Sequence, residues 1–481
     1  MPERDRGAAG FPWETIAKEL KLGIQGTVLL RDGDGYESAR KVWNGLIDRH
    51  PEAVVYSRGT ADVVHVLNIV RSYSVPFTVR SGGHSVAGTS VCDGGLVLDL
   101  SRMKGIWVDP KRKTVQVQAG VVWGDVDRET QLHGLATTGG LISTTGVAGF
   151  TLGGGIGWLS RKYGLACDNL RSAEVVTADG RVLHASLSEN PDLFWALRGG
   201  GGNFGVVTAM EFQLHEVGPV VYGGAVFYPG ETSAELLHWY SDWIRAAPDE
   251  LSSIVVLTTA PPAPFLPAAI HGKPVAALAM CHVGGLKAGK SFGEAVRKFA
   301  VPAADLLGPI PYVALQSMFD PMNPPGLLNY WKNCYLPGLG GTETGRLAKV
   351  SSTLPSPLTE VHVQHVGGCS RHAPEGGTAF SRRRHEILIN IVAKWTDPLA
   401  TERTIGWARD LWASLATPGA TETYLNFLAD ATPEAVKTAY GDAEFSRLAA
   451  LKTRYDPENL FRGTHGLDQA ARAVAGPAVR G

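Results

Sequence analysis

Several features that mark common protein classes are scarce in this sequence. No run of about 18 apolar residues is present to cross a bilayer, and Met1–Thr15 lacks the apolar segment of a cleaved signal peptide. The formal net charge is −1, which argues against the basic surface of a nucleic-acid or anionic-lipid binder. We therefore expect a cytoplasmic protein with neither a nucleic-acid nor a membrane partner.

Cysteine is sparse as well. The chain has five cysteines, an odd number, and no two of them form a CxxC pair. This pattern argues against both a zinc site and a disulfide framework, and it fits a reducing compartment. We therefore expect no metal. The five residues are Cys92, Cys167, Cys281, Cys334 and Cys369.

Glycine, in contrast, is abundant. The chain has 58 glycines among 481 residues, well above the usual ~7 %. Such an excess indicates many places where the backbone turns tightly or approaches another group closely. A chain of this length also usually folds into more than one domain.

The local patterns change near Val217. Before it, apolar residues at helical spacing after Thr60 predict a helix that ends by Pro76, and a strand follows at Phe77–Arg80. Asp179-Gly180 between two strand patterns predicts a hairpin. After Val217 the elements are longer, which is typical of an α+β domain with an antiparallel sheet. They are helices at Ser233–Ala246 and Glu402–Leu415, and strands at Ser253–Thr258, Val275–Cys281, Val361–Val366 and Glu386–Ala393.

Two glycine clusters are candidates for chemistry. The first, Ser81-Gly-Gly-His-Ser85, follows a strand, so its consecutive N–H groups can bind a diphosphate beside His84. A solvated turn with an incidental histidine explains it equally well. The second spans Gly146–Gly157, but Gly155-x-Gly157 is followed by Ser160 where a Rossmann fingerprint needs glycine. A nicotinamide-dependent dehydrogenase therefore remains an alternative only.

Five separated motifs resemble one family. They lie at Val79–Gly88, Asp93–Met103, Leu152–Leu170, Glu189–Thr208 and Tyr455–Phe461. In this order they resemble the vanillyl-alcohol-oxidase superfamily, in its bacterial berberine-bridge-like branch. The resemblance implies an α+β fold: a two-lobed PCMH-type FAD-binding domain at 1–217, a cap domain with an antiparallel sheet and flanking helices at 218–438, and a segment at 439–481 that returns to the first domain.

The resemblance also implies a covalent cofactor. FAD is expected to bond to His84, while the glycine loop cradles its pyrophosphate. Relatives with a second, cysteinyl bond carry cysteine near the position of Ile142 or Ser143. No cysteine stands there, and Cys167 is interpreted as a small buried thiol, so we expect attachment through His84 only. The other expected cofactor-binding residues are Arg80, Ser81, Gly82, Gly83, Ser85, Thr145, Gly146, Gly149, Val206, Asn426 and His465.

Candidate catalytic residues come from the same comparison. Tyr424, in Tyr424-Leu-Asn-Phe427, is predicted to lie on a strand by the flavin and to act as acid, base or anchor if its pKa is lowered. His362, which shares a strand face with Gln364, is a second candidate base, although a plain sheet-face residue is an equal alternative. Tyr330 and Lys332 are further pocket candidates. Thr464-His465-Gly466 stands where relatives carry an asparagine-containing tripeptide that reaches the flavin, and His465 is expected to substitute for it.

The resemblance and these residues together imply an oxidase. It is expected to move a hydride from a CH–OH or CH–N carbon of a small apolar or aromatic metabolite to flavin, and then to O₂, giving H₂O₂. Small Thr145 fits an oxygen-reactive flavin, or is simple packing. The alternatives are a flavin-N5-oxide monooxygenase and a flavin-retaining binding protein. A monomer and a homodimer remain equally open. Four aromatic residues suggest an apolar pocket: Tyr330, Trp331, Tyr335 and Phe427.

Overall fold

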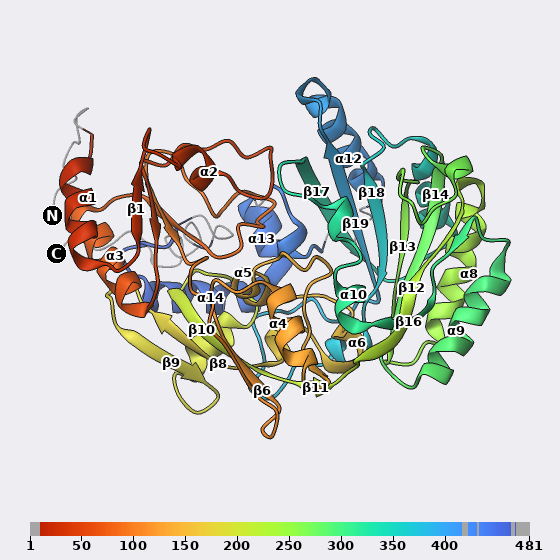
Figure 1. The fold of residues 1–481 in the computed structure, drawn as a ribbon, viewed down its shortest axis with the longest axis horizontal. Helices are drawn as coiled ribbons and strands as arrows, with labels where there is room; N and C mark the ends of the chain where they lie inside the picture. The colour runs from red at the N-terminus through yellow and green to blue at the C-terminus, as the bar shows by residue number, and fades with distance from the viewer. Residues whose placement is uncertain (1–9, 416–421, 431, 463–466, 468–481) are drawn as a thin grey trace.

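The computed structural model describes residues 10–415, 422–430, 432–462 and 467. Figure 1 shows two halves side by side. The N-terminal half carries two smaller sheets, and the other half is one large sheet with helices along its outer face. This mixed α and β arrangement confirms the predicted fold class.

The first sheet has four strands in the order β1-β2-β4-β3, of which β2, β4 and β3 are parallel. Its neighbour α3 buries Val63, Val66, Leu67 and Val70, as the helical spacing predicts. The helix begins at Thr60 itself, because Gly59 holds the N-cap position, and it ends before Ser74. The strands are β1 (Thr27–Leu30), β2 (Ala53–Tyr56), β3 (Phe77–Arg80) and β4 (Leu96–Asp99); the helices are α1 (Trp13–Gly23), α2 (Tyr36–Arg40) and α3 (Thr60–Tyr73).

The second sheet is antiparallel, in the order β5-β6-β10-β8-β9. The predicted hairpin around Asp179-Gly180 is confirmed, since β8 pairs with β9 and Gly180 has a φ of +83°. The strands are β5 (Ile106–Asp109), β6 (Thr114–Gln118), β8 (Leu170–Val176), β9 (Val182–Ser186) and β10 (Val206–Gln213), and β7 (Leu135–Ala136) pairs with β11 (His215–Glu216). The helices are α4 (Trp123–Gln131), α5 (Val147–Leu152), α6 (Ser160–Tyr163) and α7 (Pro191–Leu197).

The large sheet follows the order β15-β12-β14-β13-β18-β19-β17, and β16 also pairs with β12. All four strands predicted after Val217 are present, and each differs from its prediction by one or two residues at its ends. The strands of this sheet are β12 (Val220–Pro229), β13 (Leu251–Thr259), β14 (Pro274–His282), β15 (Ala304–Asp305), β16 (Gly308–Pro311), β17 (Leu328–Leu336), β18 (Glu360–His365) and β19 (Ile387–Trp395).

Helices cover the outer face of this sheet with an apolar core, while its inner face meets Trp158 and Leu159 of the N-terminal half. Figure 1 shows α8 and α9 on the side away from the first domain. The helices of this half are α8 (Ser233–Arg245), α9 (Leu286–Phe299), α10 (Tyr312–Gln316), α11 (Gly341–Ala348) and α12 (Thr401–Leu415).

The C-terminal helices return to the N-terminal half. Val436 and Leu448 share its core, and Figure 1 places both helices there. They are α13 (Pro433–Tyr440) and α14 (Asp442–Tyr455). One local prediction is wrong: Leu425–Phe427 forms a 3₁₀ turn rather than a strand, because it leaves the sheet to pack against the glycine loops.

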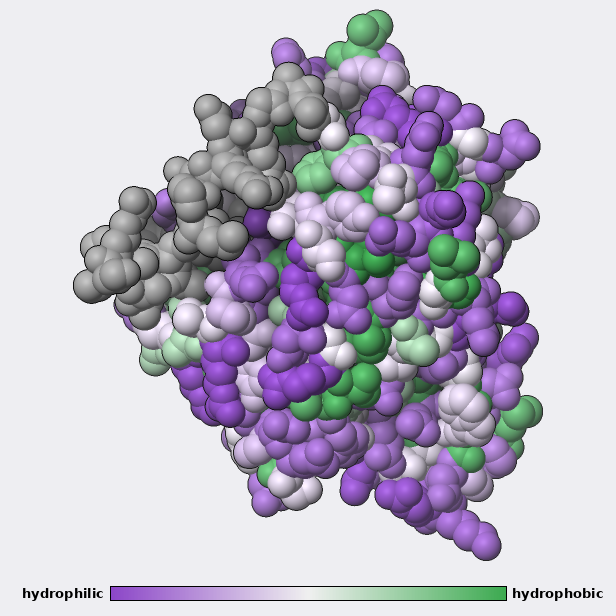
Figure 2. Space-filling model, turned by 90° about the vertical axis from the view of Figure 1, so that its left-hand side faces the viewer, coloured by the Kyte–Doolittle hydropathy of each residue, from purple (hydrophilic) through white to green (hydrophobic). Residues whose placement is uncertain are grey.

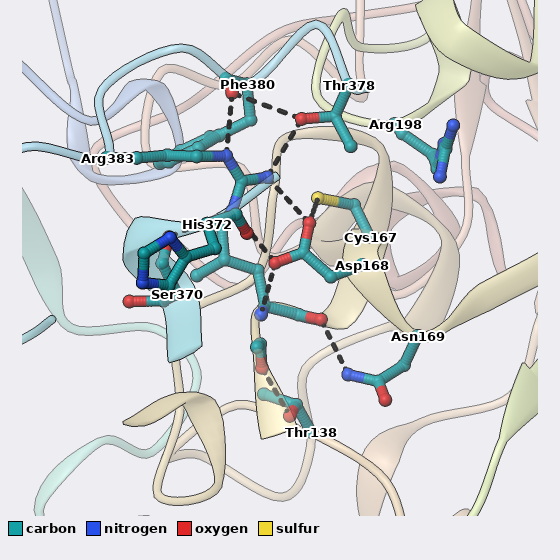
Figure 3. A network of polar contacts seen from close by, with 12 residues as sticks. Thr138, Cys167, Asp168, Asn169, Arg198, Ser370, His372, Thr378, Phe380 and Arg383 are labelled. Carbon is teal, nitrogen blue, oxygen red and sulfur yellow. Dashed lines mark hydrogen bonds and ion pairs between the residues drawn. The ribbon is translucent and has the colours of Figure 1, made fainter. Parts of the chain in front are cut away.

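A buried ion pair ties the two halves together. Arg383, in the segment before β19, donates from Nη2 to Oδ1 of Asp168 at 2.6 Å and from Nη1 to Oδ2 at 2.9 Å. Figure 3 shows the two side chains facing each other, with Thr378 beside the guanidinium. Breaking one partner of such a buried pair typically costs about 3–5 kcal/mol. The contact therefore joins the segment before β19 to the first domain.

No helix among the described residues is long and apolar enough to cross a membrane. On the face that Figure 2 presents, polar and apolar side chains are interspersed.

Candidate active site

A cavity of about 260 Å³ lies between the two halves. Its walls come from the loop after β3, the loop before α5, the glycines before β10, and Leu425–Leu428. Trp331 of β17 closes it on the cap side. Ten of the predicted cofactor-binding residues line it together: Ser81, Gly82, Gly83, His84, Ser85, Thr145, Gly146, Gly149, Val206 and Asn426.

The loop after β3 offers a row of unpaired donors. Among the described residues no acceptor pairs with the backbone N–H groups of Gly82, Gly83, His84 and Ser85. Gly83 has a φ of +68°, and such an alternation of backbone conformation turns successive N–H groups toward one point. Backbone N–H groups away from solvent are nearly always satisfied, so four consecutive donors without a protein acceptor at a cavity suit an anionic ligand.

Glycine is required where the two loops meet. A Cβ on Gly82 would lie 2.5 Å from the backbone nitrogen of Gly146, and a Cβ on Gly146 would lie 2.5 Å from the nitrogen of Gly82. Gly149 differs, since no atom lies within 4 Å of its Cβ position. The close contact between Gly82 and Gly146 sets the distance between the two loops. The open space at Gly149 leaves room for a ligand.

Arg80 does not line the cavity, although the sequence predicts it as a cofactor-binding residue. Its side chain is buried, pairs with Asp99, and donates to the carbonyl oxygens of Ala39 and Lys41. As the last residue of β3 it points to the opposite side from the loop. It therefore supports the loop from behind.

His84 is held on two sides. Its Nε2 lies 3.0 Å from Oγ1 of Thr144, and the ring of Trp43 stacks on it with 5.0 Å between centroids. Burial lowers the pKa of the imidazole to about 4. At neutral pH the ring is uncharged and keeps one nitrogen lone pair, which is the form that can act as a nucleophile.

The loop opposite His84 is fixed by the cap. The backbone N–H of Ser143 donates to Oδ1 of Asp320 at 2.8 Å, and the Ser143 hydroxyl donates to Oδ2. Ile142 and Thr145 face the cavity on either side of this anchor. No cysteine is among the lining residues, and Cys167 is fully buried elsewhere, as predicted.

Tyr424 supports the site without lining it. Its hydroxyl accepts from Gly155 N–H at 2.9 Å and from Nδ2 of Asn426 at 2.8 Å. Burial raises the pKa of Tyr424 far above neutrality. The prediction of a lowered pKa is therefore wrong, and Tyr424 does not act as a base. The same bonds orient Asn426, which also donates to the carbonyl of Phe150 and packs directly on Gly153.

His362 lies on the inner face of the cap sheet beside a charged pair. Oε2 of Glu360 is 3.0 Å from its Nε2 and 3.1 Å from Nζ of Lys394. Burial alone would raise the pKa of Glu360, but Lys394 and His362 outweigh it and lower the pKa to about 2. Nearby Gln364 is buried, and neither atom of its amide has a partner among the described residues.

Two further predicted pocket residues are placed elsewhere. Tyr330 and Lys332 alternate with Trp331 along β17 and therefore point to the outer face. There the Tyr330 hydroxyl pairs with Asp430, and Lys332 lies over the ring of Trp412. The pocket roles of both residues are wrong. His465 lies outside the described residues.

Sequence reasoning missed Trp43 and Thr144. Trp43 lies 41 positions before His84 in a stretch with no motif, and only the fold brings it there. Thr144 stands directly before Thr145, and this position next to a predicted cofactor-binding residue was the available signal.

Comparison with known proteins decides the family. An FAD-binding domain model matches residues 51–186, and a model described as berberine and berberine like matches residues 423–468. The (R)-6-hydroxynicotine oxidase of Paenarthrobacter nicotinovorans is 31% identical over 462 residues, which are 93% of this chain and 97% of that protein. This chain belongs to the berberine-bridge-like family of FAD-linked oxidoreductases.

Solved structures agree with this assignment. The crystal structure of 6-hydroxy-D-nicotine oxidase from Arthrobacter nicotinovorans matches this oxidoreductase with a TM-score of 0.85 and 28% identity, over 93% of this chain and 99% of that one. Glucooligosaccharide oxidase from Acremonium strictum, whose FAD is 6-S-cysteinyl and 8α-N1-histidyl, has a TM-score of 0.81 at 22% identity, over 94% and 98%. An FAD-dependent monooxygenase of Fusarium proliferatum is 39% identical over 199 residues, 41% of this chain and 38% of that protein.

Proposed function

We propose that this FAD-linked oxidoreductase is an oxidase whose flavin is bonded to His84. It would oxidise a CH–OH or CH–N carbon of a small apolar or aromatic metabolite and reduce O₂ to H₂O₂. One observation carries the proposal: His84 stands among four consecutive residues whose backbone N–H groups have no acceptor among the described residues, and its ring lines the cavity of an FAD-binding domain.

The residues present fit FAD. The N–H groups of Gly82–Ser85 would bind the diphosphate, and the space at Gly149 would admit the cofactor beside the backbone. Asn426 would hydrogen-bond the polar edge of the ring system, since Tyr424 and Gly153 hold it at the cavity wall. When bound, FAD supplies a two-electron acceptor for a hydride.

The side chain of Ile142 supports a single covalent bond between FAD and the protein, through His84. This side chain lines the cavity near the position where doubly bonded relatives carry cysteine, and a hydrocarbon cannot form that bond. The next residue, Ser143, is turned toward Asp320.

His362 is the base that the cap face supports best. Glu360 is ionised at neutral pH, so it accepts a hydrogen bond from Nε2–H of His362 and leaves Nδ1 free to take a proton from substrate. His362 pairs across strands with Asn390, and Asn390 pairs with Asn333 of β17. These residues share the inner face of the sheet with Trp331, which lines the cavity, whereas His362 itself is not among the lining residues.

The test combines colour and product. Purified wild type is precipitated in acid, and yellow colour is expected to stay with the chain, whereas His84→Ala is expected to release it. An aerobic screen of small alcohols and amines should then give one H₂O₂ for each substrate oxidised. Colour that leaves wild type in acid would remove the covalent claim, and turnover without H₂O₂ would remove the oxidase.

A monooxygenase is the second candidate. The local identity to a named FAD-dependent monooxygenase and the small Thr145 at the cavity favour it. Comparing the flavin absorbance of the resting enzyme before reduction and after re-aeration separates the two. The flavin of an oxidase returns to its starting spectrum after re-aeration. A resting spectrum that disappears on reduction and is replaced by a different one after re-aeration supports the monooxygenase.

A further inference from the structure

One residue flanks the ring of His84 on each side. The indole of Trp43 stacks on the imidazole with 5.0 Å between ring centroids, and the hydroxyl oxygen of Thr144 lies 3.0 Å from Nε2. Thr144 directly follows Ser143 in the loop opposite. These two neighbours limit where the imidazole can point, so the contacts that hold them also decide the orientation of His84.

Both neighbours are held by the same five residues of the cap, Phe319–Asn323. On one side, the indole N–H of Trp43 donates to the backbone carbonyl of Asn323 at 3.0 Å. On the other side, the carboxylate of Asp320 accepts hydrogen bonds from the backbone N–H and the hydroxyl of Ser143. One short segment is therefore bonded to the chain on both sides of the imidazole, although none of its residues lines the cavity.

The cap sheet holds this segment in place. The ammonium group of Lys394 in β19 donates to the carbonyl of Met322 at 3.0 Å and to the side-chain oxygen of Asn323 at 3.2 Å. The amide of Asn323 in turn donates to the carbonyl of Phe319 at 2.8 Å. The Lys394 side chain is only 1% exposed and also pairs with Glu360. A displacement of the cap sheet would therefore move both residues that flank the imidazole.

We infer that the cap segment Phe319–Asn323 orients His84 for bonding to the flavin. It holds Trp43 on one side of the imidazole and, through Asp320, Thr144 on the other. The inference rests on the proposed covalent function and adds a role for the cap in attachment. Asp320 is a positioning residue, because it acts on the flavin only through His84 and its neighbours.

Attachment is sensitive to this orientation because the bond forms between two defined atoms. An imidazole nitrogen of His84 bonds to the 8α carbon of the flavin as a methyl C–H bond breaks, and the imidazole N–H proton leaves. The two electrons released reduce the flavin, and O₂ then takes two electrons and two protons to give H₂O₂. A misplacement of about 1 Å can slow such an oriented step by about 10²-fold.

Non-covalent binding of FAD has a different structural basis. No hydrogen bond among the described residues joins Gly82–Ser85, the expected diphosphate site, to Phe319–Asn323. Loosening the cap segment should therefore slow the covalent step and leave the affinity for FAD unchanged. A residue that only maintains the fold would change both together, so the two quantities distinguish the roles.

Asp320→Ala is the discriminating variant, because it removes both bonds to Ser143 at a half-buried site. Asp305→Ala is its matched control, since that carboxylate accepts from Leu307 N–H and from Arg297 within the cap. Flavin-free protein from riboflavin-limited expression is mixed with saturating FAD, and intact mass under denaturing conditions follows incorporation. We expect incorporation to slow about 10–100-fold in Asp320→Ala and to match wild type in Asp305→Ala.

Two further readouts separate positioning from a general loss of structure. Quenching of FAD fluorescence measures non-covalent binding, which should be the same in Asp320→Ala and wild type. The flavin-free Asp320→Ala and Asp305→Ala proteins should have similar melting temperatures. Asp320→Asn keeps one acceptor oxygen for the backbone N–H of Ser143, so it should incorporate FAD at an intermediate rate.

Trp43→Phe tests the opposite side of the ring. It keeps an aromatic face against His84 and removes the indole N–H that reaches Asn323. Loss of one neutral hydrogen bond predicts incorporation about fivefold slower than in wild type. Trp395→Phe is the matched control, since its indole N–H donates to Thr401 inside the cap, and its incorporation rate should match wild type.

The outcomes distinguish this inference from the proposed function. Wild-type incorporation rates in Asp320→Ala and Asp320→Asn, or in Trp43→Phe, would overturn the two-sided arrangement. Equal slowing in Asp305→Ala and Trp395→Phe would also overturn it, because any weakening of the cap would then have the same effect. A wild-type chain that gains no flavin mass would instead remove the proposed covalent function.

Discussion

The two walls of the active site are built from different materials. The FAD-domain wall is mainly backbone: free N–H groups of Gly82–Ser85, and glycines packed against each other. On the cap side Trp331 is the one described residue of the large sheet that lines the cavity, and the rest of the sheet's inner face carries buried polar side chains, with Glu360 and Lys394 paired and Gln364 unpartnered among the described residues. A site made of backbone N–H groups depends on where the glycines are and how they are spaced, and both can be read directly from a sequence. A side-chain site depends on which strands meet, so one wall is far easier to predict than the other.

Gly82→Ala tests the backbone wall and has the largest expected effect. The new Cβ would lie 2.5 Å from the nitrogen of Gly146, so the two loops must separate. We expect loss of essentially all bound flavin and a lower melting temperature. Gly149→Ala is the control: its Cβ meets nothing within 4 Å, so flavin-free protein should keep its melting temperature while flavin occupancy falls. Equal flavin content in Gly82→Ala and wild type would contradict the account.

His362→Asn tests the cap wall. Removing a general base typically lowers turnover by about 10²–10⁴-fold. We therefore expect kcat to fall at least a hundredfold, while the covalent flavin and its absorbance are unchanged. His372→Asn is the matched control, because His372 is exposed and its side chain has no hydrogen-bond partner among the described residues. Turnover in His362→Asn within threefold of wild type would show that another group takes the proton.

Glu360→Gln sharpens the charge argument. The folded-state pKa of Glu360 is lowered to about 2, so its stabilisation is complete above the ordinary carboxyl pKa and is lost as pH falls through 2. The variant leaves Lys394 buried without its partner, which typically costs about 3–5 kcal/mol at neutral pH. Denaturant titration at pH 7 and pH 3 should show a smaller deficit at the lower pH. A deficit that grows toward acid would contradict the sign.

These outcomes bear on what the sequence could predict. The SGGH loop, its cavity neighbours Thr145 and Asn426, and the strands of the cap follow from glycine spacing, alternation and the family motifs. Arg80 directly precedes this loop in the sequence, yet as the last residue of β3 its side chain points behind the loop. Trp43 gave no signal, since a stacking partner 41 residues away is fixed only by tertiary structure.

Gln364→Leu addresses the unpartnered amide. Replacing a buried polar group that lacks a partner with an apolar one of similar shape is neutral or stabilising. We expect the substrate-free enzyme to gain about 1 kcal/mol or less, whereas KM rises if the amide binds substrate. Chemical unfolding together with steady-state kinetics checks both. A clear loss of stability would mean that the amide is satisfied in solution.

Tyr424→Phe has the smallest expected effect on catalysis. The variant removes an acceptor for Gly155 N–H and Asn426, so we expect a loss of about 1–3 kcal/mol in stability. Because burial keeps this phenol neutral, the pH dependence of kcat should not move. Tyr312→Phe is the control, since that buried hydroxyl has no partner among the described residues. A shifted acid or alkaline limb would restore Tyr424 as a titrating group.

The central claim is that the glycine loop delivers an uncharged imidazole to the flavin. Tandem mass spectrometry of a proteolytic digest, made from wild type expressed with ample riboflavin, tests it most directly. The account predicts one flavin-bearing peptide, with the modification on His84 and no cysteine modified. Flavin found on another residue, or a His84 peptide recovered wholly unmodified, would contradict it.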